Sequence, residues 1–185
     1  MVDTGSMRKG ITIIIDGEIY KILEYNHVKQ GRGTAFVRLT LRNVRTGATT
    51  VKTVMAGERF EQARLENKKV TFLYRDGDQF HFMDQETYEQ PEVGADIIGD
   101  AAKYMREGQE LELLFYGNEV LDVALPPAVE LTITETEPNY KGDTSSGGKP
   151  ATLETGAVTT VPFFVSRGEK IRVDTRNGNY IERVG

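Results

Sequence analysis

The sequence contains no cysteine and no tryptophan, and only two histidines occur among its 185 residues. The absence of cysteine excludes structural disulfides, thiolate zinc sites and cysteine nucleophiles. The histidines, His27 and His81, are not accompanied by a nucleophile or by a set of metal ligands. We therefore predict that the protein is not an enzyme and that it needs no metal or other cofactor.

Long apolar runs are also missing. No segment approaches the length that spans a membrane, and residues 1–10 lack the apolar core of a signal sequence. Together with the lack of cysteine, this favours a reducing compartment, so we expect a cytoplasmic protein with no membrane partner. The tripeptide Gly5-Ser6-Met7 resembles a cloning scar, and we place no functional weight on the residues before Arg8.

Charge is distributed unevenly along the chain. The net charge is −5, which by itself argues against binding to nucleic acid. Residues 1–64, however, carry a net +5, residues 65–127 carry −9, and residues 128–185 carry −1. This asymmetry indicates that the N-terminal part meets a polyanion while the acidic middle limits indiscriminate adhesion.

Short apolar alternations separated by turn residues predict an all-β fold. Residues 1–64 are expected to form a small barrel of about five strands, and residues 65–127 and 128–185 suit two partly open barrels of the oligonucleotide-binding (OB) type. In the last block we expect strands at 129–136, 157–165, 170–175 and 180–184, with a loop over 138–150. One helix is predicted between Gly94 and Gly108, where apolar residues follow helical spacing: Ile97, Ile98, Ala101, Ala102 and Met105.

The segment 27–34 is predicted to form a long hairpin tip between two strands. Gly31 and Gly33 flank Arg32 and leave its guanidinium uncovered at the apex, with Lys29 on the same loop. Arginine offers a planar fork for phosphate and a face for stacking on bases. Two interpretations fit, a solvated turn and an RNA contact. Four cations on the strands and turn behind the tip favour RNA, because together they would form a basic stripe: Arg38, Arg42, Arg45 and Lys52.

The segment 142–150 is a second candidate site, because long loops of small residues are often functional. A flexible connector is the alternative. The segment matches no phosphate-binding loop, since Lys149 is followed by Pro150 and a strand instead of Ser or Thr and a helix.

The three-block layout, the tip from Lys29 to Gly33 and the segment from Gly142 to Ala157 resemble the bacterial translation elongation factor P family across the whole chain. The resemblance implies an SH3-like (KOW-like) barrel followed by two OB-fold barrels, in an L-shaped, tRNA-like arrangement. It also implies a monomeric translation elongation factor. Such a factor binds the 70S ribosome between the P and E sites, stabilises peptidyl-tRNA in the P site and promotes peptide bond formation at polyproline stalls.

The resemblance also implies roles for individual residues. Arg32 would reach the acceptor end of the peptidyl-tRNA, in a tip loop completed by Lys29, Gln30, Gly31 and Gly33. Many relatives carry a modified residue at this position, so a tip-modifying enzyme acting on Arg32 is a further partner, and the state of Arg32 stays open. The remaining expected contacts, to ribosome, mRNA or tRNA, are Gly142, Asp143, Thr144, Tyr180 and Arg183. For Tyr180, ordinary packing in the barrel is the alternative.

Other classes of protein fit less well. A general binder of single-stranded nucleic acid needs clustered aromatic platforms, whereas the aromatic residues of this chain are scattered. The related archaeal and eukaryotic factor lacks a third barrel, so the block 128–185 argues against it. The Gly142-Asp143-Thr144 segment favours elongation factor P itself over its paralogue, the elongation factor P-like protein.

Overall fold

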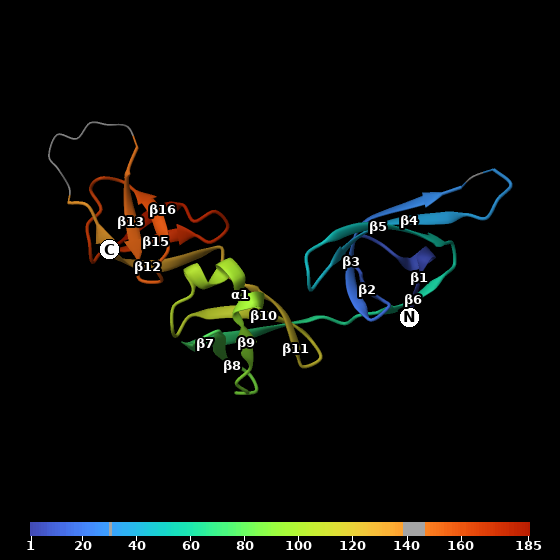
Figure 1. Cartoon of the computed structure of the whole chain (residues 1–185), viewed down its shortest axis with the longest axis horizontal. Coiled ribbons are helices and arrows are strands. Elements are labelled where there is room, and N and C mark those ends of the chain that lie inside the picture. The colour runs from blue at the N-terminus through green and yellow to red at the C-terminus, as the bar shows by residue number, and fades with distance from the viewer. Residues whose placement is uncertain (30, 139–146) are drawn as a thin grey trace. The chain divides into compact units, whose positions relative to one another are not determined.

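The computed structural model describes residues 1–29, 31–138 and 147–185. Within these ranges the chain consists mainly of β-strands with a few short helices, which confirms the all-β prediction (Figure 1). The chain divides into two compact units. One contains Met1–Glu66 and Leu114–Leu121, and the other contains Asn67–Leu113 and Asp122–Gly185. The division into domains at residues 64 and 127 stays a prediction.

Six strands of the first unit form one antiparallel sheet in the order β1-β6-β2-β3-β4-β5. The strands are β1 (Val2–Asp3), β2 (Thr12–Ile15), β3 (Glu18–Val28), β4 (Phe36–Asn43), β5 (Thr49–Met55) and β6 (Arg59–Gln62). In β4, side chains alternate between the two faces, so Val37, Leu39 and Leu41 are buried while Arg38 and Arg42 are exposed. The curled sheet closes around a core to which β1, β2, β3, β4, β5 and β6 all contribute (Figure 1).

The residues before Arg8 are part of this barrel. The backbone N–H of Thr4 donates to the carbonyl of Glu58 over 3.1 Å, and the Thr4 hydroxyl accepts from the N–H of Gly57 over 2.6 Å. Val2 and Met7 are buried in the core. The segment therefore has a structural role, and its strand β1 is the sixth strand of the sheet. That it carries no functional weight stays a prediction.

The second sheet has the order β11-β10-β7-β8-β9. Its strands are β7 (Glu66–Asp76), β8 (Gln79–Asp84), β9 (Glu92–Gly94), β10 (Glu110–Tyr116) and β11 (Glu119–Ala124). Phe72 lies in its interior, with its ring centroid 5.8 Å from that of Phe80 and 5.5 Å from that of Phe82. Aromatic rings at these separations pack closely, and all three rings are buried.

The predicted helix is present in altered form. Its first part is α1 (Ala95–Ile98), and the chain continues as the 3-10 helix η2 (Gly99–Tyr104). The change occurs at Gly99, whose φ of +54° lies in the left-handed region. The helical spacing identified the segment correctly, but a single helix through residue 105 was wrong because Gly99 interrupts it.

The third sheet has the order β14-β13-β12-β15-β16. Its strands are β12 (Ala128–Thr136), β13 (Lys149–Leu153), β14 (Val158–Val161), β15 (Lys170–Asp174) and β16 (Tyr180–Val184). Strand β13 was missed because its first residues were taken as the end of a loop, and Pro150 is a poor strand residue. The strand expected at 157–165 ends at Val161, because Pro162 has no N–H with which to continue the ladder.

One turn geometry recurs once in each sheet, although the sequence has no exact repeat. The turns begin at Asn43, Asp84 and Asp174, and in each the side-chain oxygen accepts the backbone N–H two residues later over 2.8 to 2.9 Å. The N–H of the fifth residue donates to the carbonyl of the first over 2.8 to 2.9 Å. These bonds lower the pKa of Asp84, mainly through the N–H of Thr87 and then that of Glu86. The short polar side chain thus closes each turn.

The fifth residue of each turn has a positive φ, +76° at Gly47, +75° at Gly178 and +61° at Tyr88. A side chain with a Cβ is strained there by about 1 kcal/mol or more. Tyr88 is 71% exposed, so removing its ring costs little packing. We expect Tyr88→Gly to raise the free energy of unfolding by about 0.5 to 1 kcal/mol, measured by urea denaturation. Tyr88→Ala, which removes the ring and keeps the Cβ, should give no such gain. Equal effects of the two variants would contradict the assignment of strain.

Candidate functional site

The hairpin of β3 and β4 extends beyond the rest of its barrel and carries the predicted tip (Figure 1). The strands stay paired as far as Val28 and Phe36, and Lys29, Arg32 and Gly33 are exposed beyond them. Gly31 has a φ of +46°, a conformation that glycine adopts without strain. Arg32 forms no ion pair with any residue that the structure describes, while Gln30 lies outside the described residues. The structure thus confirms that the segment between Val28 and Phe36 connects the two strands of a hairpin at its exposed end.

The basic stripe expected behind the tip is only partly present. Arg38 and Arg42 lie four residues apart on β4, an even separation that places both on its outer face. Lys52 pairs with the inward residue Leu39, so its side chain leaves β5 on the other face. Arg45 is engaged elsewhere in the same unit. Of the four cations, only Arg38 and Arg42 therefore share the outer face without an ion pair to a described residue. The sequence did not predict that Lys52 lies on the other face, because this depends on the register of β4 and β5.

Arg45 binds the turn between β10 and β11. Its Nε and a terminal guanidinium nitrogen lie 2.9 and 3.0 Å from the two carboxylate oxygens of Glu119, and it donates to the carbonyl of Gly17 over 3.2 Å. Hydrogen bonds to Arg45 lower the pKa of Glu119, and those to Glu119 raise the pKa of Arg45. Both side chains are partly exposed, so the pair adds less than about 1 kcal/mol. Arg45 is a structural residue, which joins strands far apart in the sequence.

The expected contact residues Gly142, Asp143 and Thr144 lie outside the described residues. Next to them in the sequence, Lys149 is buried in β13 and its Nζ donates to the carbonyl of Glu137 over 2.7 Å. This bond ties the start of β13 to the segment that follows β12. Lysine is rarely buried unless its ammonium group has partners, so Lys149 has a structural role that the sequence did not suggest.

Tyr180 and Arg183 lie on β16, where an irregularity in the pairing at Ile181 places both on the same side of the strand. The Tyr180 ring is partly buried and packs against the core of the third sheet, which favours the packing interpretation for the ring. A terminal nitrogen of Arg183 lies 3.3 Å from Glu169 Oε1, and its guanidinium carbon lies 5.4 Å from the ring centre of Phe164. Their role in contacting RNA stays a prediction.

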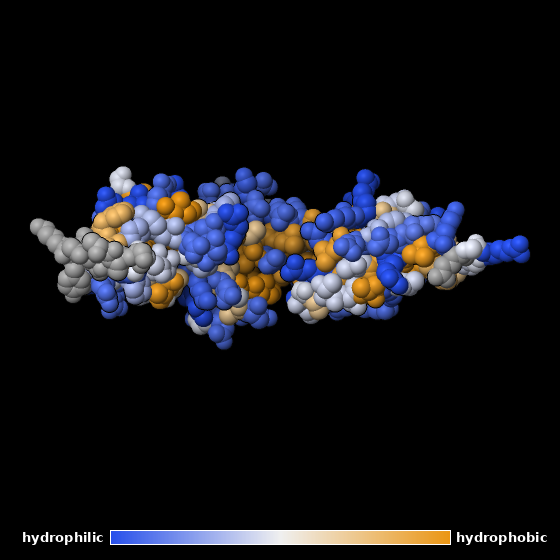
Figure 2. Space-filling model, turned by 90° about the horizontal axis from the view of Figure 1, so that it is seen from above, coloured by the Kyte–Doolittle hydropathy of each residue, from blue (hydrophilic) through white to orange (hydrophobic). Residues whose placement is uncertain are grey.

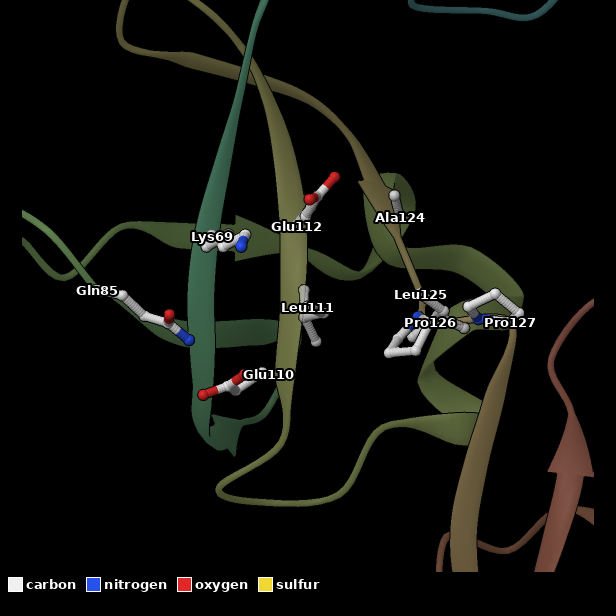
Figure 3. A pocket seen from close by; sticks show the side chains of 9 residues that line it. All are labelled: Lys69, Gln85, Glu110, Leu111, Glu112, Ala124, Leu125, Pro126 and Pro127. Carbon is white, nitrogen blue, oxygen red and sulfur yellow. The ribbon is translucent and has the colours of Figure 1, made fainter.

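Other features of the described part of the chain give no sign of catalysis. His81 stacks on Tyr74 with ring centres 4.4 Å apart. No group of three or more possible metal-ligating side chains occurs among the described residues. A hollow of about 360 Å³ on the second sheet is shown in Figure 3, and its lining has no hydroxyl or imidazole group: Lys69, Gln85, Glu110, Leu111, Glu112, Ala124, Leu125, Pro126 and Pro127. Within the described ranges, no helix is long and apolar enough to cross a membrane.

Comparisons with known proteins agree with this architecture. The elongation factor P KOW-like domain matches residues 3–60, the elongation factor P OB domain matches 65–123, and the elongation factor P C-terminal domain matches 129–183. The fold is similar to that of eukaryotic translation initiation factor 5A from Methanococcus jannaschii, with a TM-score of 0.56 and 24% identity over 66% of this chain and 92% of that one. A KOW-like barrel followed by OB-type sheets defines a class of translation factors.

The similarity in sequence is much closer to one member of that class. Elongation factor P of Herpetosiphon aurantiacus is 61% identical and that of Pelotomaculum thermopropionicum is 51% identical, each over 185 residues and the whole of both chains. The chain belongs to the elongation factor P family and is a translation elongation factor.

Proposed function

We propose that the protein binds the 70S ribosome between the P and E sites, stabilises peptidyl-tRNA in the P site and promotes peptide bond formation at polyproline stalls. Arg32 faces the acceptor end of the tRNA in this proposal. The observation that carries it is the exposed Arg32 at the end of a projecting hairpin, where it forms no ion pair with a described residue. A guanidinium that is free of intramolecular partners is available to phosphate and ribose.

The proposed mechanism is positional. The ribosome makes the peptide bond, and the factor restricts the motion of the tRNA that carries the reacting group. Holding a reactive end in a productive geometry lowers a barrier by several kcal/mol without acid, base or nucleophilic chemistry.

The third part of the chain, residues 128–185, would complete the ribosomal contact. We propose that Gly142, Asp143 and Thr144 contact the ribosome or mRNA, and that Arg183 and the polar edge of Tyr180 add contacts from β16. The protein would act as a monomer in the cytoplasm, where translating ribosomes are found. A tip-modifying enzyme acting on Arg32 is the remaining proposed partner.

The test is translation of a reporter with consecutive prolines in a purified system, with and without the unmodified recombinant protein. We expect full-length product to increase when the protein is added, while a proline-free reporter should be unchanged. If the unmodified protein is inactive, the intact mass of protein purified from its own host separates the two explanations. An added group on the chain would point to a required modification, and an unaltered mass would contradict the proposed function.

A further inference from the structure

The outer face of β3, β4 and β5, behind the tip, combines apolar and cationic side chains. Register places Val28, Phe36 and Met55 side by side on this face, in the row nearest the tip. They are 36%, 38% and 54% exposed. In Figure 2, apolar side chains lie among hydrophilic ones on the surface of the first unit, at the right of the view. This apolar row has no covering element among the described residues of its unit.

Cations flank the apolar row. The next row contains Arg38, and the row farthest from the tip contains Lys21 and Arg42. None of these three forms an ion pair with a residue in the described ranges, and the only carboxylate among the rows of this face is that of Glu24. The face is therefore net positive, and it continues into the tip with Lys29 and Arg32.

We infer that the apolar row is a stacking platform for an unpaired RNA base, with Arg38 binding the adjacent phosphate. This inference rests on the proposed function, because the RNA is the one that the tip reaches. Nucleic acid satisfies both properties of the face, since a base presents an apolar surface and the backbone presents phosphates. An aromatic ring next to an arginine is the usual protein counterpart of such a nucleotide.

A protein partner would use the face differently. Protein surfaces that bind an apolar patch are apolar at the centre, and the surrounding free cations would then need carboxylates on the partner. For a protein contact, the volume of the side chain at position 36 decides affinity. For base stacking, the aromatic ring itself decides it. Conservative substitutions at position 36 therefore distinguish a protein partner from a stacked base.

The experiment uses the full-length protein and two fluorescently labelled RNA hairpins, one ending in a few unpaired nucleotides and one with a blunt end. We expect Phe36→Leu to weaken binding of the unpaired-end hairpin about tenfold, while Phe36→Tyr stays within about twofold of the unaltered protein. The blunt hairpin should bind all three proteins equally. Tyr74→Leu, the same kind of change at an exposed aromatic residue of the second sheet, is the control and should have no effect.

Two results would overturn the inference. Equal binding by Phe36→Leu and the unaltered protein would show that no base stacks on the ring. A loss of ribosome binding in Phe36→Ala, with RNA-hairpin binding unchanged, would assign the row to a protein partner. The proline reporter is measured in parallel with the unaltered protein, so that a failure of the proposed function is recognised separately from a failure of the platform.

Discussion

Replacing Arg32 with alanine should abolish rescue at consecutive prolines. The guanidinium is exposed on the hairpin tip and forms no ion pair with a described residue, so its interactions are available to a partner. The substitution removes the planar donor fork that matches phosphate and ribose. We expect the yield from the proline reporter to fall to the level without factor. The free energy of unfolding should change by less than about 0.5 kcal/mol, because an exposed tip contributes little to the core.

Two further variants sharpen this prediction. Arg64→Ala removes an exposed arginine from the same unit and should leave rescue unchanged. Arg32→Lys keeps the charge and loses the fork, so partial rescue would assign part of the effect to charge and part to geometry. Full rescue by Arg32→Ala would remove the tip from the mechanism. Unfolding of that variant would contradict the placement of Arg32 outside the core.

Gly178→Ala is expected to lower the free energy of unfolding by about 3 kcal/mol. A Cβ at this position would lie 2.5 Å from the hydroxyl oxygen of Tyr104, whose ring packs against the core of the third sheet. The φ of +75° adds the strain of a left-handed backbone. Urea or thermal denaturation of the two proteins measures the difference.

Two controls separate the clash from the backbone strain. Gly168→Ala also has a positive φ, +88°, but its Cβ would meet no atom within 4 Å, so it should lose only about 1 to 2 kcal/mol. Tyr104→Phe removes the nearest atom and leaves the next at 3.6 Å. In that background, the cost of Gly178→Ala should fall to the level of Gly168→Ala. Equal losses in the two glycine variants of the unaltered background would show that Tyr104 moves away without cost.

Sequence patterns predicted most strands because each has the period of two that a half-buried strand requires. The β4 pattern around Val37, Leu39 and Leu41 is an example. The failures have a common cause. Strand β13 begins at Lys149 and Pro150, residues with no strand pattern, and it forms because β12 and β14 pair with it on both sides. The two-residue strand β1 is too short for any period and depends on its pairing with β6.

One part of the candidate site could be predicted from the sequence and another part could not. The exposed tip could be predicted, because glycine on both sides of Arg32 is a local signal that needs no partner elsewhere in the chain. The sequence could not show which cations of the basic stripe share one face and lack an ion pair. Cations that are close in the sequence acquire different neighbours when the chain folds. Arg45 meets Glu119 from a distant hairpin, and Lys52 is turned to the other face by the register of β5.

The sequence alone determined the all-β class, the position of the tip and the resemblance to one family, because turn residues and alternating apolar residues act locally. The tertiary structure decided which of the cations are free, that Lys149 and Thr4 are buried, and that Val28, Phe36 and Met55 form one exposed row. These properties depend on which strands become neighbours and in what register. A shift of one residue would move every side chain of a strand to the opposite face.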